Sequence, residues 1–178
     1  RSKGVEITTM GDIPSGSGLG SSSTVTVGAL HAMYAYLNCS INAEQLAREA
    51  CEIEIDILKK PIGVQDQYIA AYGGLRFFEF SNSGEVCNHQ LALDEVLMTR
   101  LNENLLLYFT GTTRQAESIL LEQKDNIRVK KATLRQLKEL AYIAREELQK
   151  GNIDVIGTLL HESWQYKKQL ASKISNGH

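Results

Sequence analysis

A glycine- and serine-rich segment reads Pro14-Ser15-Gly16-Ser17-Gly18-Leu19-Gly20-Ser21-Ser22-Ser23-Thr24, and an apolar run follows from Val25. Glycine has no Cβ, so its backbone adopts positive φ and approaches a ligand closely. Successive amide N–H groups in such a loop can form a concave anion site. The helix expected after the loop adds its N-terminal dipole and unpaired amides. The stretch therefore predicts a phosphate-binding loop.

Two common phosphate loops do not fit this stretch. A Walker A loop needs Gly-Lys before Ser or Thr, and no lysine lies between Lys3 and Lys59. A Rossmann fingerprint needs G-x-G-x-x-G, whereas the three glycines here alternate as G-x-G-x-G. A flexible linker or ordinary glycine-rich turn is the alternative.

The charge pattern argues against a linker. No charged residue occurs between Ile13 and Ala43, although charged residues make up 22% of the chain. We therefore expect this segment to be buried and His31 to be a packed core histidine. An anion bound at the start of the following helix should meet no competing carboxylate.

Local patterns place the remaining elements. They predict strands at 5–10, 75–80, 86–91 and, as a buried strand, 105–110, and helices at 22–37, 43–58, 65–72, 115–123, 126–150 and 153–173. Asn42 is the expected N-cap of the second helix. The fold class is α+β, with helices packed on one side of strands and a mainly helical C-terminal section. A composition change near residue 103 predicts two parts, 1–103 and 104–178.

The bulk composition excludes several classes of protein. A net charge of −2 argues against a dedicated nucleic-acid binder, and no apolar run approaches the roughly 20 residues that span a bilayer. Three cysteines without a CxxC pair, and no visible signal peptide, favour a reduced, cytoplasmic setting. The cysteines and histidines show no metal-ligand spacing. The lysines and arginines of the last two helices are expected on a solvated face, and a homodimer is compatible with the sequence.

One carboxylate stands out on the second predicted helix. Its apolar face is formed by Leu46, Ala47, Ala50, Cys51, Ile57 and Leu58. Glu54 projects from the middle of that face, where an unpartnered carboxylate is costly. Two explanations stay open: a buried ion pair with lysine or arginine, or a Mg²⁺ ligand, since Mg²⁺ takes one or two protein carboxylates besides phosphates and water.

Asp66 follows the turn Pro61-Ile62-Gly63. An aspartate there is often a first-turn helix residue stabilised by the dipole. A carboxylate near a phosphate loop could instead orient or deprotonate an attacking hydroxyl.

Together these segments resemble the GHMP kinase superfamily of small-molecule kinases. Pro14–Thr24 looks like the family's second motif, P-x-G-x-G-L-G-S-S, and the block from Glu54 to Gly63-x-x-Asp66-Gln67 is similar to that of its sugar kinases. Two further stretches look most like the D-glycero-D-manno-heptose 7-phosphate kinases. They read Asp66-Gln67-Tyr68…Ala71-Tyr72-Gly73-Gly74 and Tyr108-Phe109-Thr110-Gly111…Arg114-x-Ala116…Ile119-Leu120.

The resemblance implies a fold and a set of roles. The fold would be the GHMP N-terminal domain, of the ribosomal protein S5 domain 2-like type, joined to the helical start of the C-terminal domain. Pro14–Ser23 would bind the ATP triphosphate, Ser22 and Glu54 would ligate Mg²⁺, and Asp66 would lie beside the acceptor hydroxyl as base or orienter. Further sugar-phosphate contacts would come from Asp66, Gly73, Thr110 and Arg114. The implied reaction moves the γ-phosphoryl of ATP to a sugar hydroxyl, the anomeric one in heptose kinases, which supply activated heptose for surface polysaccharide.

The chain also departs from the family pattern. The first motif, P-G-R-[VI], is absent, and so is the third, glycine-rich one. We therefore expect a fragment covering the middle of a family member. The alternatives are another GHMP kinase (galactokinase-, fucokinase- or mevalonate-type), a non-catalytic nucleotide- or sugar-binding member, or an interaction module working through residues 126–173.

Overall fold

The computed structural model describes residues 4–13, 16–108, 117–172 and 174–175, which divide into two compact units. The first unit holds the described residues up to Gly74, and the second holds residues 75–108 and those from Glu117 onward. Helices accompany a two-stranded sheet, so the predicted α+β class is confirmed. None of the described helices is both long and apolar enough to cross a membrane.

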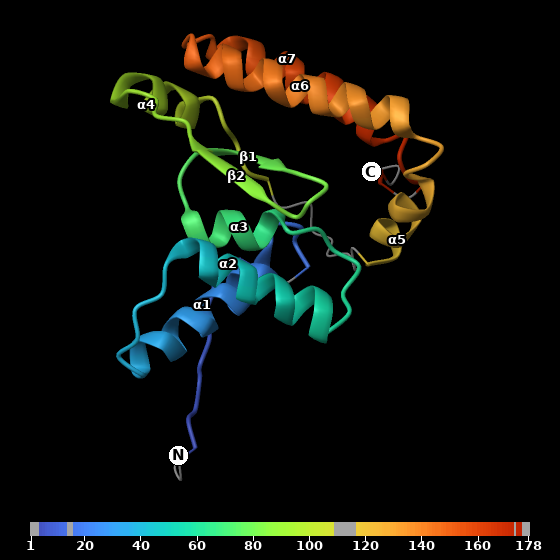
Figure 1. Ribbon diagram of the computed structural model, residues 1–178. Coiled ribbons are helices and arrows are strands. Elements are labelled where there is room, and N and C mark those ends of the chain that lie inside the picture. The colour runs from blue at the N-terminus through green and yellow to red at the C-terminus, as the bar shows by residue number, and fades with distance from the viewer. Residues whose placement is uncertain (1–3, 14–15, 109–116, 173, 176–178) are drawn as a thin grey trace. The chain divides into compact units, whose positions relative to one another are not determined.

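The first unit is helical. It contains α1 (Ser21–Tyr36), α2 (Ala43–Cys51), the π-helix η1 (Glu52–Ile57) and α3 (Gln65–Tyr72) (Figure 1). These bounds confirm three predicted helices, although the second half of the 43–58 helix is a π-helix. As predicted, Asn42 caps α2, because its side chain accepts a hydrogen bond from the backbone N of Gln45 at 2.8 Å.

The core of this unit lies between α1 and α2. Val27 and Leu30 of α1 pack with Leu46 and Ala50 of α2, and Ala70 and Ala71 of α3 complete the cluster. Each fully buried Val or Leu side chain contributes roughly 1.5–3 kcal/mol. This core holds the N-terminal end of α1 against the elements that carry Glu54 and Asp66.

Three expectations for the first unit are wrong. Residues 4–11 form no strand, since they pair with no other described strand. The uncharged segment is not buried throughout: only Ser23, Val27 and Leu30 of α1 are buried, and His31 is exposed. Helix α1 packs against α2, α3 and η1, and other residues of the helix, such as Val25 and Met33, are 50% and 42% exposed.

The second unit combines a hairpin with helices. Strands β1 (Arg76–Phe80) and β2 (Val86–Gln90) pair antiparallel, with Phe78 opposite Asn88, which confirms both predicted strands. The helices are α4 (Glu95–Glu103), α5 (Glu117–Asn126), α6 (Lys131–Gln149) and α7 (Ile153–Lys167). Helices α6 and α7 lie side by side in Figure 1, joined by a turn at Gly151.

Two small cores hold the second unit. One gathers Leu91, Leu101, Leu148 and Ile153, from beside β2 and from α4, α6 and α7. The other gathers Leu170, Ala171 and Ile174 against α5 and α6. Lys131, Arg135 and Lys138 of α6 are exposed, as expected for a solvated face.

The C-terminal predictions need correction at several points. Helix α4 was not expected, although Asp94 caps it by accepting a hydrogen bond from the backbone N of Leu97. Helix α6 begins at Lys131 rather than 126, and α7 ends at Lys167 rather than 173. The part of the predicted strand at 105–110 that is described, 105–108, is neither a strand nor buried, with Leu106 77% exposed. It pairs with no described strand, and residues 109–110 lie outside the described residues.

Candidate functional site

The glycine loop leads directly into α1. Gly16, Gly18 and Gly20 all have positive φ (76°, 81° and 71°), a conformation that L-residues rarely adopt. Gly20 is the N-cap of α1, and no side chain caps the helix there. The first-turn N–H groups of α1 therefore face no side-chain acceptor, which leaves them for an anion. Pro14 and Ser15, predicted as part of the same loop, lie outside the described residues.

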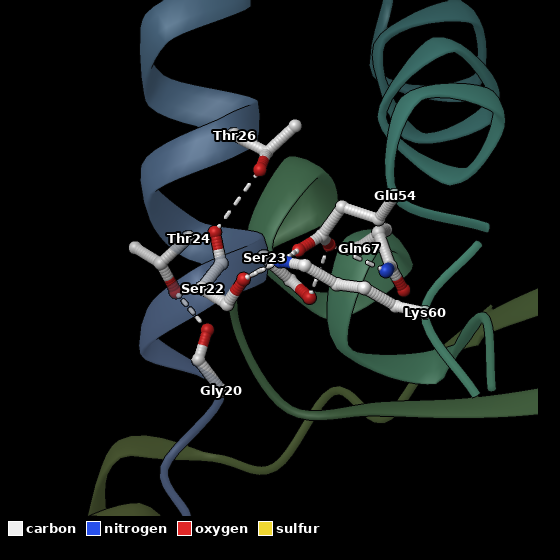
Figure 2. Close-up of polar contacts among 8 residues, drawn as sticks. All are labelled: Gly20, Ser22, Ser23, Thr24, Thr26, Glu54, Lys60 and Gln67. Carbon is white, nitrogen blue, oxygen red and sulfur yellow. Dashed lines mark hydrogen bonds and ion pairs between the residues drawn. The ribbon is translucent and has the colours of Figure 1, made fainter. Parts of the chain in front are cut away.

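Glu54 lies at the centre of a closed polar network (Figure 2). It is 0% exposed and accepts hydrogen bonds from four side chains on three parts of the chain: α1, the segment after η1, and α3. These are Ser22 Oγ at 2.5 Å and Lys60 Nζ at 2.9 Å to Oε1, and Ser23 Oγ and Gln67 Nε2, both at 2.7 Å, to Oε2. The prediction that Glu54 is buried on the helix and needs partners is confirmed.

The network outweighs the cost of burying Glu54. Burial raises the pKa of the carboxyl group, but the hydrogen bonds from Ser22, Lys60, Ser23 and Gln67 together outweigh it, so the pKa lies below its ordinary value. Glu54 is therefore an anion at neutral pH. Removing one partner from this buried network costs free energy, and the negative charge of Glu54 favours a bound cation.

The π-helix sets the direction of the Glu54 side chain. In η1, Leu58 N donates to Ile53 O at 2.9 Å, an i→i−5 bond, and Lys60 N donates to Glu54 O at 3.0 Å. A π-turn rotates less per residue than an α-turn, so the predicted apolar face does not continue. Ile57 and Leu58, expected on that face, are 65% and 57% exposed.

Lys60 was missed by the sequence reasoning. Its Nζ donates to Ser22 Oγ at 2.6 Å as well as to Glu54, so a cation does lie at the start of α1. The ion-pair explanation of Glu54 is thus confirmed, while the Mg²⁺ explanation stays a prediction. The only signal in the sequence was proximity: Lys60 follows Glu54 by six residues, which is no helical spacing.

Gln67 contributes to the network from α3. It is 0% exposed and donates through Nε2 to Glu54, but its Oε1 has no hydrogen-bond partner among the described residues. Helix α3, which carries Gln67, is tied to α2 because Tyr68 and Tyr72 each donate to Glu44 at 3.0 Å. Gln67 is therefore held in place by its helix.

Asp66 lies beside the glycine loop. A Cβ placed on Gly20 would be 3.4 Å from Asp66 Cγ, so the side chain of Asp66 approaches Gly20 closely. Asp66 and Glu54 thus both lie near the start of α1. The expectation that no carboxylate would compete with an anion there is wrong, because other segments of the chain bring these two carboxylates close. An anion bound there needs a cation to offset these charges.

The predicted sugar-phosphate contacts are only partly described. Asp66 is in the first turn of α3, whereas Gly73 caps its other end, about 10 Å away at 1.5 Å per residue. Gly73 is thus not brought to the glycine loop by α3. Thr110 and Arg114 lie outside the described residues.

The oxygens of Ser22 and Glu54 are suitable ligands for Mg²⁺. A carboxylate oxygen and a hydroxyl oxygen, Glu54 Oε1 and Ser22 Oγ, lie 2.5 Å apart, and both already contact a cationic group, the Lys60 ammonium. These are hard oxygen donors of the kind that Mg²⁺ takes. Among the described residues no three His, Cys, Asp or Glu side chains gather to hold a metal, so a metal here would need ligands from outside the protein. The Ser22–Glu54 pair therefore fits a Mg²⁺ site completed by phosphates and water.

Comparison with known proteins gives a consistent result. Residues 1–74 match the family model for the GHMP kinases N terminal domain. The chain is 35% identical to a D-glycero-alpha-D-manno-heptose 7-phosphate kinase of Campylobacter jejuni, over 94% of this chain and 50% of that protein. It is 30% identical to a bifunctional fucokinase/GDP-fucose pyrophosphorylase of Arabidopsis thaliana, over 98% of this chain and 17% of that protein.

A solved structure supports the same assignment. The crystal structure of a D-glycero-D-manno-heptose 1-phosphate kinase from Bacteroides thetaiotaomicron matches with a TM-score of 0.72 at 30% identity, covering 89% of this chain and 46% of that one. The chain thus spans about half the length of the heptose kinases it matches. Residues 1–74 therefore belong to the GHMP kinase N-terminal domain family, and the chain has the fold of the corresponding part of the heptose phosphate kinases.

Proposed function

We propose that this chain is the nucleotide-binding part of a sugar kinase that transfers the γ-phosphoryl group of ATP to a sugar-phosphate hydroxyl. The favoured acceptor is the anomeric hydroxyl of D-glycero-D-manno-heptose 7-phosphate. The similarity to heptose kinases over 94% of the chain supports that acceptor. The fucokinase relative makes a fucose-type sugar the second candidate.

The glycine loop and the start of α1 bind the triphosphate in this proposal. Residues 16–20 carry positive-φ glycines, and the uncapped N-terminus of α1 offers N–H donors aligned with the helix dipole. Pro14 and Ser15 complete the loop in the sequence. Backbone N–H donors suit phosphate oxygens because the loop already holds them in position, so binding needs little reorganisation.

Ser22 and Glu54 would hold Mg²⁺, which would neutralise charge on the transferred phosphoryl group. Ser23 and Gln67 fix the second oxygen of Glu54, so its first oxygen keeps a defined direction toward Ser22. The buried network thus orients the metal-ligating oxygen of Glu54 before the nucleotide binds.

Asp66 acts on the acceptor. Its carboxylate lies beside Gly20 of the glycine loop, and this closeness supports a position next to the transferred γ-phosphoryl group. It orients the hydroxyl and takes its proton as the new O–P bond forms and the bond to the β-phosphate oxygen breaks. Gly73, Thr110 and Arg114 remain proposed sugar-phosphate contacts.

One observation carries the proposal. Two distant parts of the chain bring a buried carboxylate, Glu54, to 2.5 Å from a hydroxyl in the first turn of the helix that follows the glycine loop. A purely structural ion pair would need Lys60 but would need neither the loop nor Asp66 beside it.

The test is a substrate panel with the intact protein, ATP and Mg²⁺, followed by ³¹P NMR. Heptose 7-phosphate, galactose, fucose and mevalonate are compared. We expect an anomeric phosphate on heptose 7-phosphate with the highest kcat/KM. A preference for mevalonate would overturn the sugar assignment, and no transfer to any acceptor, with ATP binding intact, would favour a non-catalytic nucleotide-binding member of the fold.

A further inference from the structure

The carboxylate of Glu54 is saturated with donors. A carboxylate has about four acceptor positions, and four side chains fill them. Ser22 and Lys60 donate to Oε1, and Ser23 and Gln67 donate to Oε2. No acceptor position is left for a metal ion, so a cation can bind Glu54 only if a donor leaves.

The four donors differ in their freedom to leave. Ser23 and Gln67 are 3% and 0% exposed and are fixed by α1 and α3. Ser22 can rotate its O–H away and still offer its oxygen to a cation. Lys60 is different, because its side chain is 29% exposed and ends a long flexible stem on the segment that follows η1. Lys60 is therefore the donor that can move into solvent.

The Lys60 ammonium also contacts both oxygens of the proposed metal pair. It lies 2.6 Å from Ser22 Oγ and 2.9 Å from Glu54 Oε1, and its backbone N–H is anchored to Glu54 O at 3.0 Å (Figure 2). A Mg²⁺ ion would take the same two oxygens as ligands. Two cations on these two oxygens would repel each other strongly in a partly buried site.

We propose that Lys60 is a displaceable cation in this site. Its ammonium holds Ser22 Oγ and Glu54 Oε1 together, and a divalent cation binds only as Lys60 Nζ leaves both oxygens. The site thereby keeps its carboxylate neutralised and its geometry formed before the metal arrives, at the expense of metal affinity. This inference rests on the proposed role of Ser22 and Glu54 as metal ligands.

The experiment measures Mn²⁺ binding to the intact protein by the loss of the free-Mn²⁺ EPR signal, without nucleotide. Lys60→Met removes the competing ammonium, so we expect Mn²⁺ to bind at least tenfold more tightly than in the wild type. Lys59→Met is the matched control, because the neighbouring lysine is exposed and its replacement removes the same charge. We expect Lys59→Met to change Mn²⁺ affinity by less than twofold.

A second variant guards against loss of folding. If Lys60→Met unfolds, Lys60→Gln is read in its place, since its amide can still donate to Glu54 but carries no charge. Equal Mn²⁺ affinity in the Lys60 variant and in Lys59→Met, including no detectable binding in either, would overturn the inference.

Glu54→Gln separates this inference from the proposed function. If Glu54→Gln abolishes Mn²⁺ binding while the Lys60 variant gains nothing, Ser22 and Glu54 remain the metal pair and only the role of Lys60 fails. If Glu54→Gln binds Mn²⁺ as tightly as the wild type, the proposed metal pair itself is wrong. The combined variant Lys60→Met/Glu54→Gln should lose the gain that Lys60→Met alone produces.

Discussion

Two glutamates, one in each unit, accept several hydrogen bonds yet serve different ends. Glu54 is 0% exposed and is enclosed by four donors, including the Lys60 ammonium. Glu79 is 36% exposed, accepts from Tyr142 Oη at 2.7 Å, and lies 3.0 Å from His89 Nε2.

The pKa of each glutamate is lowered, but for different reasons. Hydrogen bonds from Tyr142 and His89 are the two largest influences and lower the pKa of Glu79, and the smaller influence of burial opposes them. For Glu54, burial is the largest influence and raises the pKa, and four donors together reverse it. Glu79 therefore connects the β1–β2 hairpin to α6 at the surface, whereas Glu54 keeps a negative charge in the buried interior. The burial of the carboxylate, more than the number of its hydrogen-bond partners, therefore distinguishes the candidate functional site at Glu54 from the structural contact at Glu79.

The largest expected effect lies beside the enclosed network. Asp66→Asn should lower kcat for phosphoryl transfer by about 10²–10⁴-fold, the usual contribution of a general base, while ATP affinity stays near that of the wild type. Steady-state kinetics and calorimetry measure the two quantities. Glu79→Gln, the matched change in the other unit, should leave kcat within about twofold. Unchanged turnover in Asp66→Asn would remove Asp66 from the mechanism.

Removing the enclosed carboxylate should cost stability. Glu54→Ala leaves the buried donors Ser23 and Gln67 without their acceptor, and each buried polar group left unsatisfied costs about 1–3 kcal/mol. Hydrogen exchange of peptides from α1, α2 and α3 reads the first unit separately. Glu79→Ala should leave that exchange unchanged. If both variants increased hydrogen exchange in the first unit equally, Glu54 and Glu79 would not have the different roles proposed for them.

Acid should weaken the first unit through Glu54. Because its folded-state pKa lies below the unfolded value, the stabilisation is fully present above the unfolded pKa of about 4.3 and is lost as the pH falls through the folded-state pKa. Hydrogen exchange of α1 and α3 peptides at decreasing pH, corrected for intrinsic exchange rates, measures the loss. Glu54→Gln should flatten this dependence, and an unchanged profile in that variant would assign the acid sensitivity to another group.

The smallest effect concerns the structural contact at Glu79. Tyr142→Phe removes the main donor to Glu79, so the pKa of Glu79 should rise toward its ordinary value. Side-chain carboxyl ¹³C NMR titration reads that pKa directly. Mn²⁺ binding and kcat should not change. If Tyr142→Phe altered Mn²⁺ binding, the two networks could not be independent.

The sequence predicted those parts that local pattern controls. Caps, glycine turns and helical periodicity located α1, α2, α3 and the hairpin, and the misplaced Glu54 marked the site. The expected boundary near residue 103 remains a proposal.

The sequence could not predict what depends on pairing across the chain. Residues 5–10 and 105–108 have the apolar content of strands, but a strand also needs a partner, and none is found among the described residues. Lys60 follows the π-helix η1 and contacts Ser22, and no spacing rule anticipates a π-turn at that place.

Ser22 and Glu54 are proposed to hold the metal ion that accompanies ATP. Calorimetric titration of ATP into the intact protein, with and without Mg²⁺, tests this proposal most directly in the wild type, Glu54→Gln and Glu79→Gln. We predict that Mg²⁺ tightens ATP binding at least tenfold in the wild type and in Glu79→Gln, and that Glu54→Gln loses this gain but keeps the Mg²⁺-free affinity. An undiminished Mg²⁺ effect in Glu54→Gln would contradict the account.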